Sequence, residues 1–150
     1  FNASGAGYDL GEKHDPETHL IPLVLQAALG KKEHVKVFGS NYPTPDGTCV
    51  RDYIHILDLA KAHLLALEKI GKIPQIYNIG TGRGHSVREI IRIAEEVTGN
   101  KIPVVDASIR EGDAAFLVAD PSKIEKAWGW KAEYDIRDII KSAWEFHKKN

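Results

Sequence analysis

The chain has 150 residues, 43% of them apolar and 27% charged, which is sufficient for one globular domain with a hydrophobic core. The 20 Lys and Arg against 21 Asp and Glu give a net charge of −1, which excludes the basic excess expected of a nucleic-acid-binding or membrane-surface protein. The single cysteine, Cys49, excludes an internal disulfide framework, and no apolar run is long enough to span a bilayer, so we expect a cytoplasmic protein.

Strands and helices alternate along the chain. Apolar residues at helical spacing predict helices, and short alternating or apolar runs predict strands. In chain order we expect the end of a strand at the first residues, a helix over 20–29, a strand over 34–39, a strand over 49–56, a helix over 59–70, a strand followed by a glycine loop within 74–84, a helix over 85–100, a strand over 102–107, an apolar run over 114–119, a short helix after Pro121 and a last helix from Asp135. This alternation predicts an α/β fold.

Two helices have explicit signals at their ends. Asp58 is expected to cap the helix over 59–70. Ser86 and Glu89 form an S-x-x-E capping box before an apolar face, and Gly99 is placed to end that helix. The chain has no initiator Met, so we expect that a preceding segment is missing.

A glycine loop, GTGRG at residues 80–84, lies between a predicted strand and a predicted helix. A dinucleotide fingerprint that begins at Gly80 would need a third glycine where this chain has His85. The loop is therefore expected to be a turn into the helix.

The histidines are the residues to test for metal binding. His14, His19 and His34 lie in polar segments without i, i+4 spacing or cysteine partners, so the sequence predicts no metal site. His55 and His63 are expected to be satisfied by neighbours in the fold.

Two arginines have aspartates beside them. Arg51 precedes Asp52, and Arg110 lies three residues before Asp113. A guanidinium is a planar fork that matches phosphate oxygens, and an aspartate can accept hydrogen bonds from ribose hydroxyls. From the residues alone, each arginine could form a structural ion pair or could hold an anionic ligand, and the ion pair is favoured.

The whole sequence resembles the UDP-glucose 4-epimerases, also called UDP-galactose 4-epimerases, of the extended short-chain dehydrogenase/reductase superfamily. The resemblance runs in order through FNASGA, HDPETHLIPLVLQAALG, VFGSNYPTPDGTCVRDYIHILDLAKAH, YNIGTGRGHSVREII, REGDAAFLVAD and WGW, and covers nearly all of the chain. Related dehydratases and decarboxylases share the Arg-Asp-x-Ile pattern, but the YPTPDGT segment is not expected in them. The resemblance implies that residues 1–150 are the C-terminal, UDP-sugar-binding portion of such a fold, with the last strands of its Rossmann sheet.

The resemblance also implies which residues bind substrate. Arg51 and Arg110 would clamp the UDP diphosphate, and Asp113 would contact the ribose. The further implied contacts are Asn2 at the end of its strand, Leu20 through its backbone, Val37 and Phe38 beside the uracil, Tyr53 in the same pocket, and Leu117 where residue size helps to decide whether N-acetylated sugars fit. His19 stands where some members have Asn.

Part of the family's machinery lies outside this chain. Members have an N-terminal Rossmann domain with a glycine fingerprint for NAD and a Tyr-x-x-x-Lys pair for proton transfer. Four residues beyond the tyrosines of this chain stand Glu12, Asp46, Leu57, Thr81 and Asp138. We therefore expect no catalytic residue here, NAD bound mainly by the missing domain, and a fragment that is inactive alone.

The implied function is the substrate-binding part of an NAD-dependent isomerase of galactose metabolism. It would interconvert UDP-glucose and UDP-galactose through a 4-keto intermediate, as a homodimer when full-length. Two alternatives stay open: a stand-alone, non-catalytic sugar-nucleotide-binding module, and a sugar-nucleotide dehydratase of the same superfamily. An upstream reading frame with the fingerprint and the Tyr-x-x-x-Lys pair would exclude the binding module, and product analysis would identify a dehydratase.

Overall fold

The computed structural model describes residues 1–71 and 76–149. The helices are α1 (Leu20–Ala28), α2 (Ile56–Glu68), α3 (Val87–Thr98), α4 (Ser122–Trp128) and α5 (Ile136–Lys149). The strands are β1 (Asn2–Ser4), β2 (Val35–Phe38), β3 (Val50–His55), β4 (Gly84–Ser86), β5 (Val104–Ala107) and β6 (Phe116–Leu117). The predicted α/β class is confirmed. Within the described ranges, no helix is both long and apolar enough to cross a membrane.

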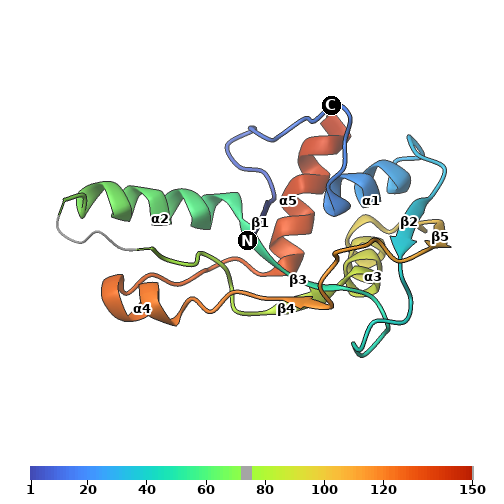
Figure 1. Cartoon of the computed structure of the whole chain (residues 1–150). Coiled ribbons are helices and arrows are strands. Elements are labelled where there is room, and N and C mark those ends of the chain that lie inside the picture. The colour runs from blue at the N-terminus through green and yellow to red at the C-terminus, as the bar shows by residue number, and fades with distance from the viewer. Residues whose placement is uncertain (72–75, 150) are drawn as a thin grey trace.

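Strand β3 is the centre of the larger sheet. Its first half pairs antiparallel with β4 and parallel with β6, and its second half pairs parallel with β1. A separate two-stranded parallel sheet joins β2 to β5. In Figure 1, β3 runs between two groups of helices, with α1, α3 and α5 on one side and α2 and α4 on the other.

The larger hydrophobic core lies among α1, α3, α5 and β2, and we call it the large core. Each of these helices turns an apolar face inward, because its apolar residues recur at helical spacing. The side chains of Leu25, Ile90 and Ile139 are completely buried there. The large core therefore ties helices from three distant parts of the chain together.

A smaller core lies between β3, α2 and α4, and we call it the small core. Its buried members are Ile54, Ala62, Ile124 and Trp130. Partly buried residues, including Leu59 and Trp128, pack around them. The opposite face of α2 is exposed and apolar: Leu64 is 61% exposed and Leu67 64%.

The predicted Ser86 cap and Gly99 end of α3 are confirmed, whereas the capping prediction for α2 is wrong. The Ser86 side chain accepts a hydrogen bond from the Glu89 backbone, and Gly99 ends α3 with a left-handed φ of 73°. Helix α2 begins at Ile56, capped by His55. Asp58 is instead fully buried, and it accepts hydrogen bonds from the backbone N–H groups of residues 133 and 134.

The strand expected within residues 74–84 differs from the structure. Residues 74 and 75 lie outside the described residues, and residues 76–79 form no strand. A strand requires a ladder of backbone hydrogen bonds, and in the described part this segment is held by its side chains, since Tyr77 and Ile79 pack on the small core. The short strand β4 begins only at Gly84.

Candidate functional site

Seven of the nine residues expected to contact substrate line one cavity of about 520 Å³, which we call the arginine cavity. It opens between the start of the chain, the first turn of α1, and strands β2 and β3. Its lining consists of Phe1, Asn2, Ala3, Ser4, Glu12, Thr18, His19, Leu20, Ile21, Lys36, Phe38, Cys49, Arg51, Tyr53, Val87, Arg110 and Asp113.

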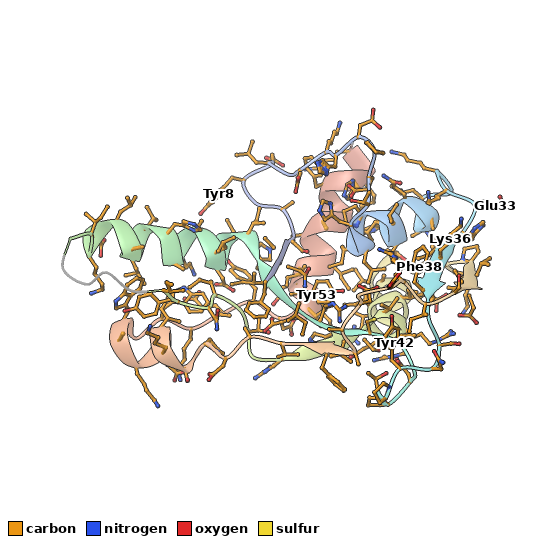
Figure 2. The ribbon with its side chains drawn as sticks, in the orientation of Figure 1. Tyr8, Glu33, Lys36, Phe38, Tyr42 and Tyr53 are labelled. Carbon is orange, nitrogen blue, oxygen red and sulfur yellow. The ribbon has the colours of Figure 1, made fainter. Side chains whose placement is uncertain are left out.

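Strand alternation decides which residues of β2 reach this cavity. Successive side chains on a strand point to opposite faces. Val35 and Val37 are buried in the large core, whereas Lys36 and Phe38 line the cavity. Figure 2 labels Lys36 and Phe38. Val37 was expected beside the ligand, but its side chain points into the large core, because it lies between Lys36 and Phe38, whose side chains point to the opposite face. Lys36 is the residue of this strand that sequence reasoning missed.

The same alternation separates two neighbouring residues of β3. Arg51 and Tyr53 line the cavity, while Asp52 between them is fully buried. The Asp52 carboxylate accepts hydrogen bonds from the Thr81 hydroxyl (2.7 Å) and from three backbone N–H groups, those of residues 81 (3.0 Å), 82 (2.9 Å) and 119 (3.2 Å). It therefore fastens the back of β3 to the glycine loop and to the segment after β6.

Arg51 pairs with Asp113 and not with its sequence neighbour Asp52. Its Nη2 lies 3.5 Å from Asp113 Oδ1, and its Nη1 donates to the carbonyls of Val50 (2.9 Å) and Ala114 (2.6 Å). These contacts fix the guanidinium, whose side chain is only 17% exposed. The residues alone favoured an ion pair here, and the structure supplies one with a different partner.

Arg110 stacks on the ring of Phe38. The guanidinium carbon lies 3.8 Å from the ring centroid, within the range of a cation–π contact. With Lys36 and Arg51, this gives three permanent cations against the carboxylates of Glu12 and Asp113 in the lining. The cavity thus combines an excess of positive charge with an aromatic surface, which suits an anion attached to a flat ring.

Tyr53 and Asn2 complete the β1–β3 side of the cavity. Burial raises the pKa of Tyr53 to about 12, although nearby Arg51 opposes the shift, so the phenol stays protonated at neutral pH. The Asn2 side-chain amide donates to the Asp52 carbonyl at 2.8 Å. Figure 2 places Tyr53 near the centre of the molecule, and both residues add hydrogen-bonding groups to the cavity lining.

Leu117 is the other expected residue that lies apart from the lining. It sits on β6, pairs with Arg51 across the β3–β6 ladder, and is 52% exposed. The lining also contains Thr18 and His19, just before α1. Their position next to Leu20 at the start of a predicted helix was the signal in the sequence, because the N-terminus of a helix favours bound anions.

A second cavity, of about 560 Å³, lies on the other side of Tyr53 between α3 and α4. Many of its charged residues are already paired: Lys131 lies 2.7 Å from Glu125, and Arg92 and Arg137 both form ion pairs with Glu96. Among the expected contact residues, Tyr53 alone is found in its described lining. The arginine cavity is therefore the better candidate for an anion site.

The histidines differ from the sequence expectation. His14 and His19, which the spacing argument separated, lie together with Glu17, and His19 lines the arginine cavity. Their ring centroids are 5.2 Å apart and nearly parallel. His55 behaves as expected, since its Nδ1 accepts from the Leu57 backbone at 3.1 Å and its Nε2 lies 3.0 Å from Ser142 Oγ.

Known proteins similar to this chain were found by sequence. The family model described as GDP-mannose 4,6 dehydratase matches residues 6–143. The UDP-glucose 4-epimerase of Rhizobium leguminosarum bv. trifolii is 49% identical over 100% of this chain and 47% of its own length. That of Corynebacterium glutamicum is 52% identical over 97% of this chain and 45% of its own length. The chain thus spans about half the length of the relatives it matches.

Solved structures give the same result. The UDP-glucose 4-epimerase of Bifidobacterium longum, in complex with NAD+ and UDP, superposes with a TM-score of 0.95 at 44% identity, over 100% of this chain and 46% of that one. The UDP-Glc/GlcNAc 4-epimerase of Campylobacter jejuni gives a TM-score of 0.82 at 38% identity, over 100% of this chain and 47% of the other. The resemblance expected from the sequence is confirmed, and so is the expected match to about half of a larger fold.

Proposed function

Because the chain belongs to the GDP-mannose 4,6 dehydratase family and is similar to proteins named UDP-glucose 4-epimerase, we propose that it is the substrate-binding part of an NAD-dependent UDP-glucose 4-epimerase. The observation that carries the proposal is the arginine cavity, which Arg51, Arg110, Lys36 and Phe38 line together. The similar proteins named UDP-glucose 4-epimerase favour this activity over that of a dehydratase. A cytoplasmic homodimer is part of the proposal for the full-length protein, and the family resemblance supports it.

The proposed roles follow from charge and shape. Arg51 and Arg110 hold the diphosphate, because a guanidinium and phosphate oxygens form short, charge-assisted hydrogen bonds. Asp113 takes the ribose hydroxyls while it keeps Arg51 in place. Phe38 supplies the flat apolar surface for the base, next to the Arg110 guanidinium.

Such an arrangement suits a reaction in which one part of the substrate must turn. A firm hold on the nucleotide diphosphate supplies binding energy and positioning, while the sugar is left free to present either face. Tyr53 and Asn2 border the same cavity with neutral hydrogen-bonding groups. This chain would therefore bind and orient the substrate.

The residues present here do not fit the dinucleotide. Gly80 lies so close to Ala119 and Asp52 that an added Cβ would collide with both, and a Cβ on Gly84 would collide with Val50 and Val118. These glycines permit close packing of the protein and do not form an open cradle for a pyrophosphate. NAD, which supplies hydride chemistry when bound, would be held mainly by the rest of the full-length protein.

The test is a calorimetric titration of the 150-residue chain with UDP. Saturable binding is expected, and Arg110→Ala should weaken it about tenfold or more, since a hydrogen bond to a charged group contributes about 1.5–3 kcal/mol. Arg83→Ala is the matched control, because Arg83 is exposed and lines the second cavity instead. Equal weakening by both variants would contradict the assignment.

The alternatives call for the full-length protein. A 4-epimer as the product supports the proposal, and a dehydrated keto sugar indicates the dehydratase. UDP binding by a full-length protein that makes neither product would favour the stand-alone binding module.

A further inference from the structure

Three potential metal ligands lie together just before α1. His14, Glu17 and His19 each offer one ligand atom, and these atoms all lie within 4.8 Å of one another. Both histidines are exposed, whereas the Glu17 side chain is only 8% exposed. The cluster thus has one fixed, partly buried member and two members that solvent can reach.

Glu17 and His19 are already held in place. Glu17 Oε1 accepts hydrogen bonds from the backbone N–H groups of Thr18 (2.8 Å) and His19 (2.7 Å), and it lies 2.8 Å from His19 Nδ1. His19 is also the N-cap residue of α1, so its backbone is fixed by the helix. Two of the three ligands are therefore oriented before any ion binds.

The chemistry of the three ligands indicates the class of ion. Two imidazoles and a carboxylate suit zinc and neighbouring transition metals, whereas magnesium and calcium prefer sites made of oxygen ligands. Zinc bonds to nitrogen and oxygen are about 2.0–2.2 Å long, so two ligand atoms on one ion lie at most about 4 Å apart. His14 is exposed and can make the small movement that closes the present spacing of up to 4.8 Å.

We propose that His14, Glu17 and His19 form a binding site for a divalent transition-metal ion of the zinc class. Three protein ligands leave at least one coordination position to water or to a ligand. His19 also lines the arginine cavity, so the site lies at the rim of that cavity.

Position adds a consequence that rests on the proposed function. A bound dication at His19 would place additional positive charge beside the proposed diphosphate site, so zinc should tighten UDP binding. This linkage is a separate measurement from metal binding itself.

The direct test is calorimetric titration of the chelator-treated chain with Zn²⁺. One ion per chain is expected, and His14→Ala should weaken binding about tenfold or more, since even loss of a group that only orients a ligand costs that much. His34→Ala is the control, because His34 is also a surface histidine next to a glutamate, with its Nδ1 4.0 Å from Glu33. It should leave the affinity unchanged.

His14→Ala changes an exposed side chain, so the variant should fold, which circular dichroism would check. Glu17→Gln is the second variant, and it should also weaken zinc binding. The proposed metal site would be wrong if the chain showed no saturable zinc binding, or if His14→Ala left zinc binding intact. UDP binding without zinc reports on the proposed function alone, so failure of one proposal can be told from failure of the other.

Discussion

The large core and the small core differ in how completely they are closed. The large core joins three helices and leaves Leu25, Ile90 and Ile139 without exposed surface. The small core buries Ile54 and Ile124 equally well, but the helix that covers it, α2, is apolar on its outer face too. A helix that is apolar on both faces is typical of a helix packed between two layers.

The difference teaches where the residues of the arginine cavity get their support. The arginine cavity is built on β2 and β3, and β2 packs into the large core. The small core lies on the other side of β3. We therefore expect the side of the chain that carries the arginine cavity to be the more stable side.

The largest expected effect is in the large core. Ile139→Ala should lower the free energy of unfolding by about 2–5 kcal/mol, because it removes buried methyl groups and leaves a cavity. Ile124→Ala is the matched change in the small core, since both side chains are fully buried. It should have a smaller global effect and should accelerate hydrogen exchange mainly in α2 and α4. Equal global losses would show that the two cores unfold as one.

A smaller effect is expected at the junction behind β3. Asp52→Asn replaces one of the two carboxylate oxygens with an NH2 group, which cannot accept a hydrogen bond, so at least one buried N–H group loses its partner. The expected cost is about 1–3 kcal/mol, measured by urea unfolding. Asp106→Asn is the control, because Asp106 forms an exposed ion pair with Arg88 and its loss should cost at most about 1 kcal/mol. A larger loss of stability in Asp106→Asn than in Asp52→Asn would contradict the role given to Asp52.

A third effect depends on pH and on His55, which connects α2 to α5 through Ser142. Burial lowers the pKa of His55 below its ordinary value of 6.5. The unfolded chain then binds the proton more readily, so stability is complete above pH 6.5 and falls as the pH drops below that value, by up to about 1.4 kcal/mol per pH unit. In His55→Asn, which keeps a capping oxygen without the titration, this slope should flatten between pH 6.5 and 5. If the slope of stability against pH is unchanged in this variant, the pH dependence arises from titratable groups other than His55.

The smallest effect on stability is expected on the outer face of α2. Leu67 is 64% exposed, so Leu67→Gln should change the free energy of unfolding by no more than about 0.5 kcal/mol. The same change should reduce any self-association of the chain seen by sedimentation velocity, because the exposed apolar surface shrinks. A large loss of stability would mean that this face is covered.

Local signals in the sequence predicted most of the fold. The end of α3 was predictable because Gly99 takes a left-handed conformation that glycine alone adopts readily. The start of α2 was misplaced by three residues, because a buried Asp58 bonded to a distant segment has the same local appearance as a capping aspartate. Tertiary contacts of this kind leave no local signal.

Seven residues of the arginine cavity were expected from the sequence, whereas Lys36 and the ion-pair partner of Arg51 were not. The Arg51–Asp113 contact joins residues far apart in the chain, and sequence adjacency favoured Asp52 instead. Strand alternation along β3 could have revealed that Arg51 and Asp52 face opposite sides. The cluster of His14, Glu17 and His19 follows no regular spacing, so only the folded loop brings it together.

The alternation along β3 also protects the fold against misassembly. A slip of one residue in the pairing of β3 would turn Arg51 into the interior and Asp52 out to the cavity. The shifted chain would bury an unpaired guanidinium and leave the N–H groups of residues 81, 82 and 119 without their acceptor. The two adjacent charges thus penalise a one-residue slip from both faces of the strand at once, which separates the native alignment of β3 from its two nearest alternatives.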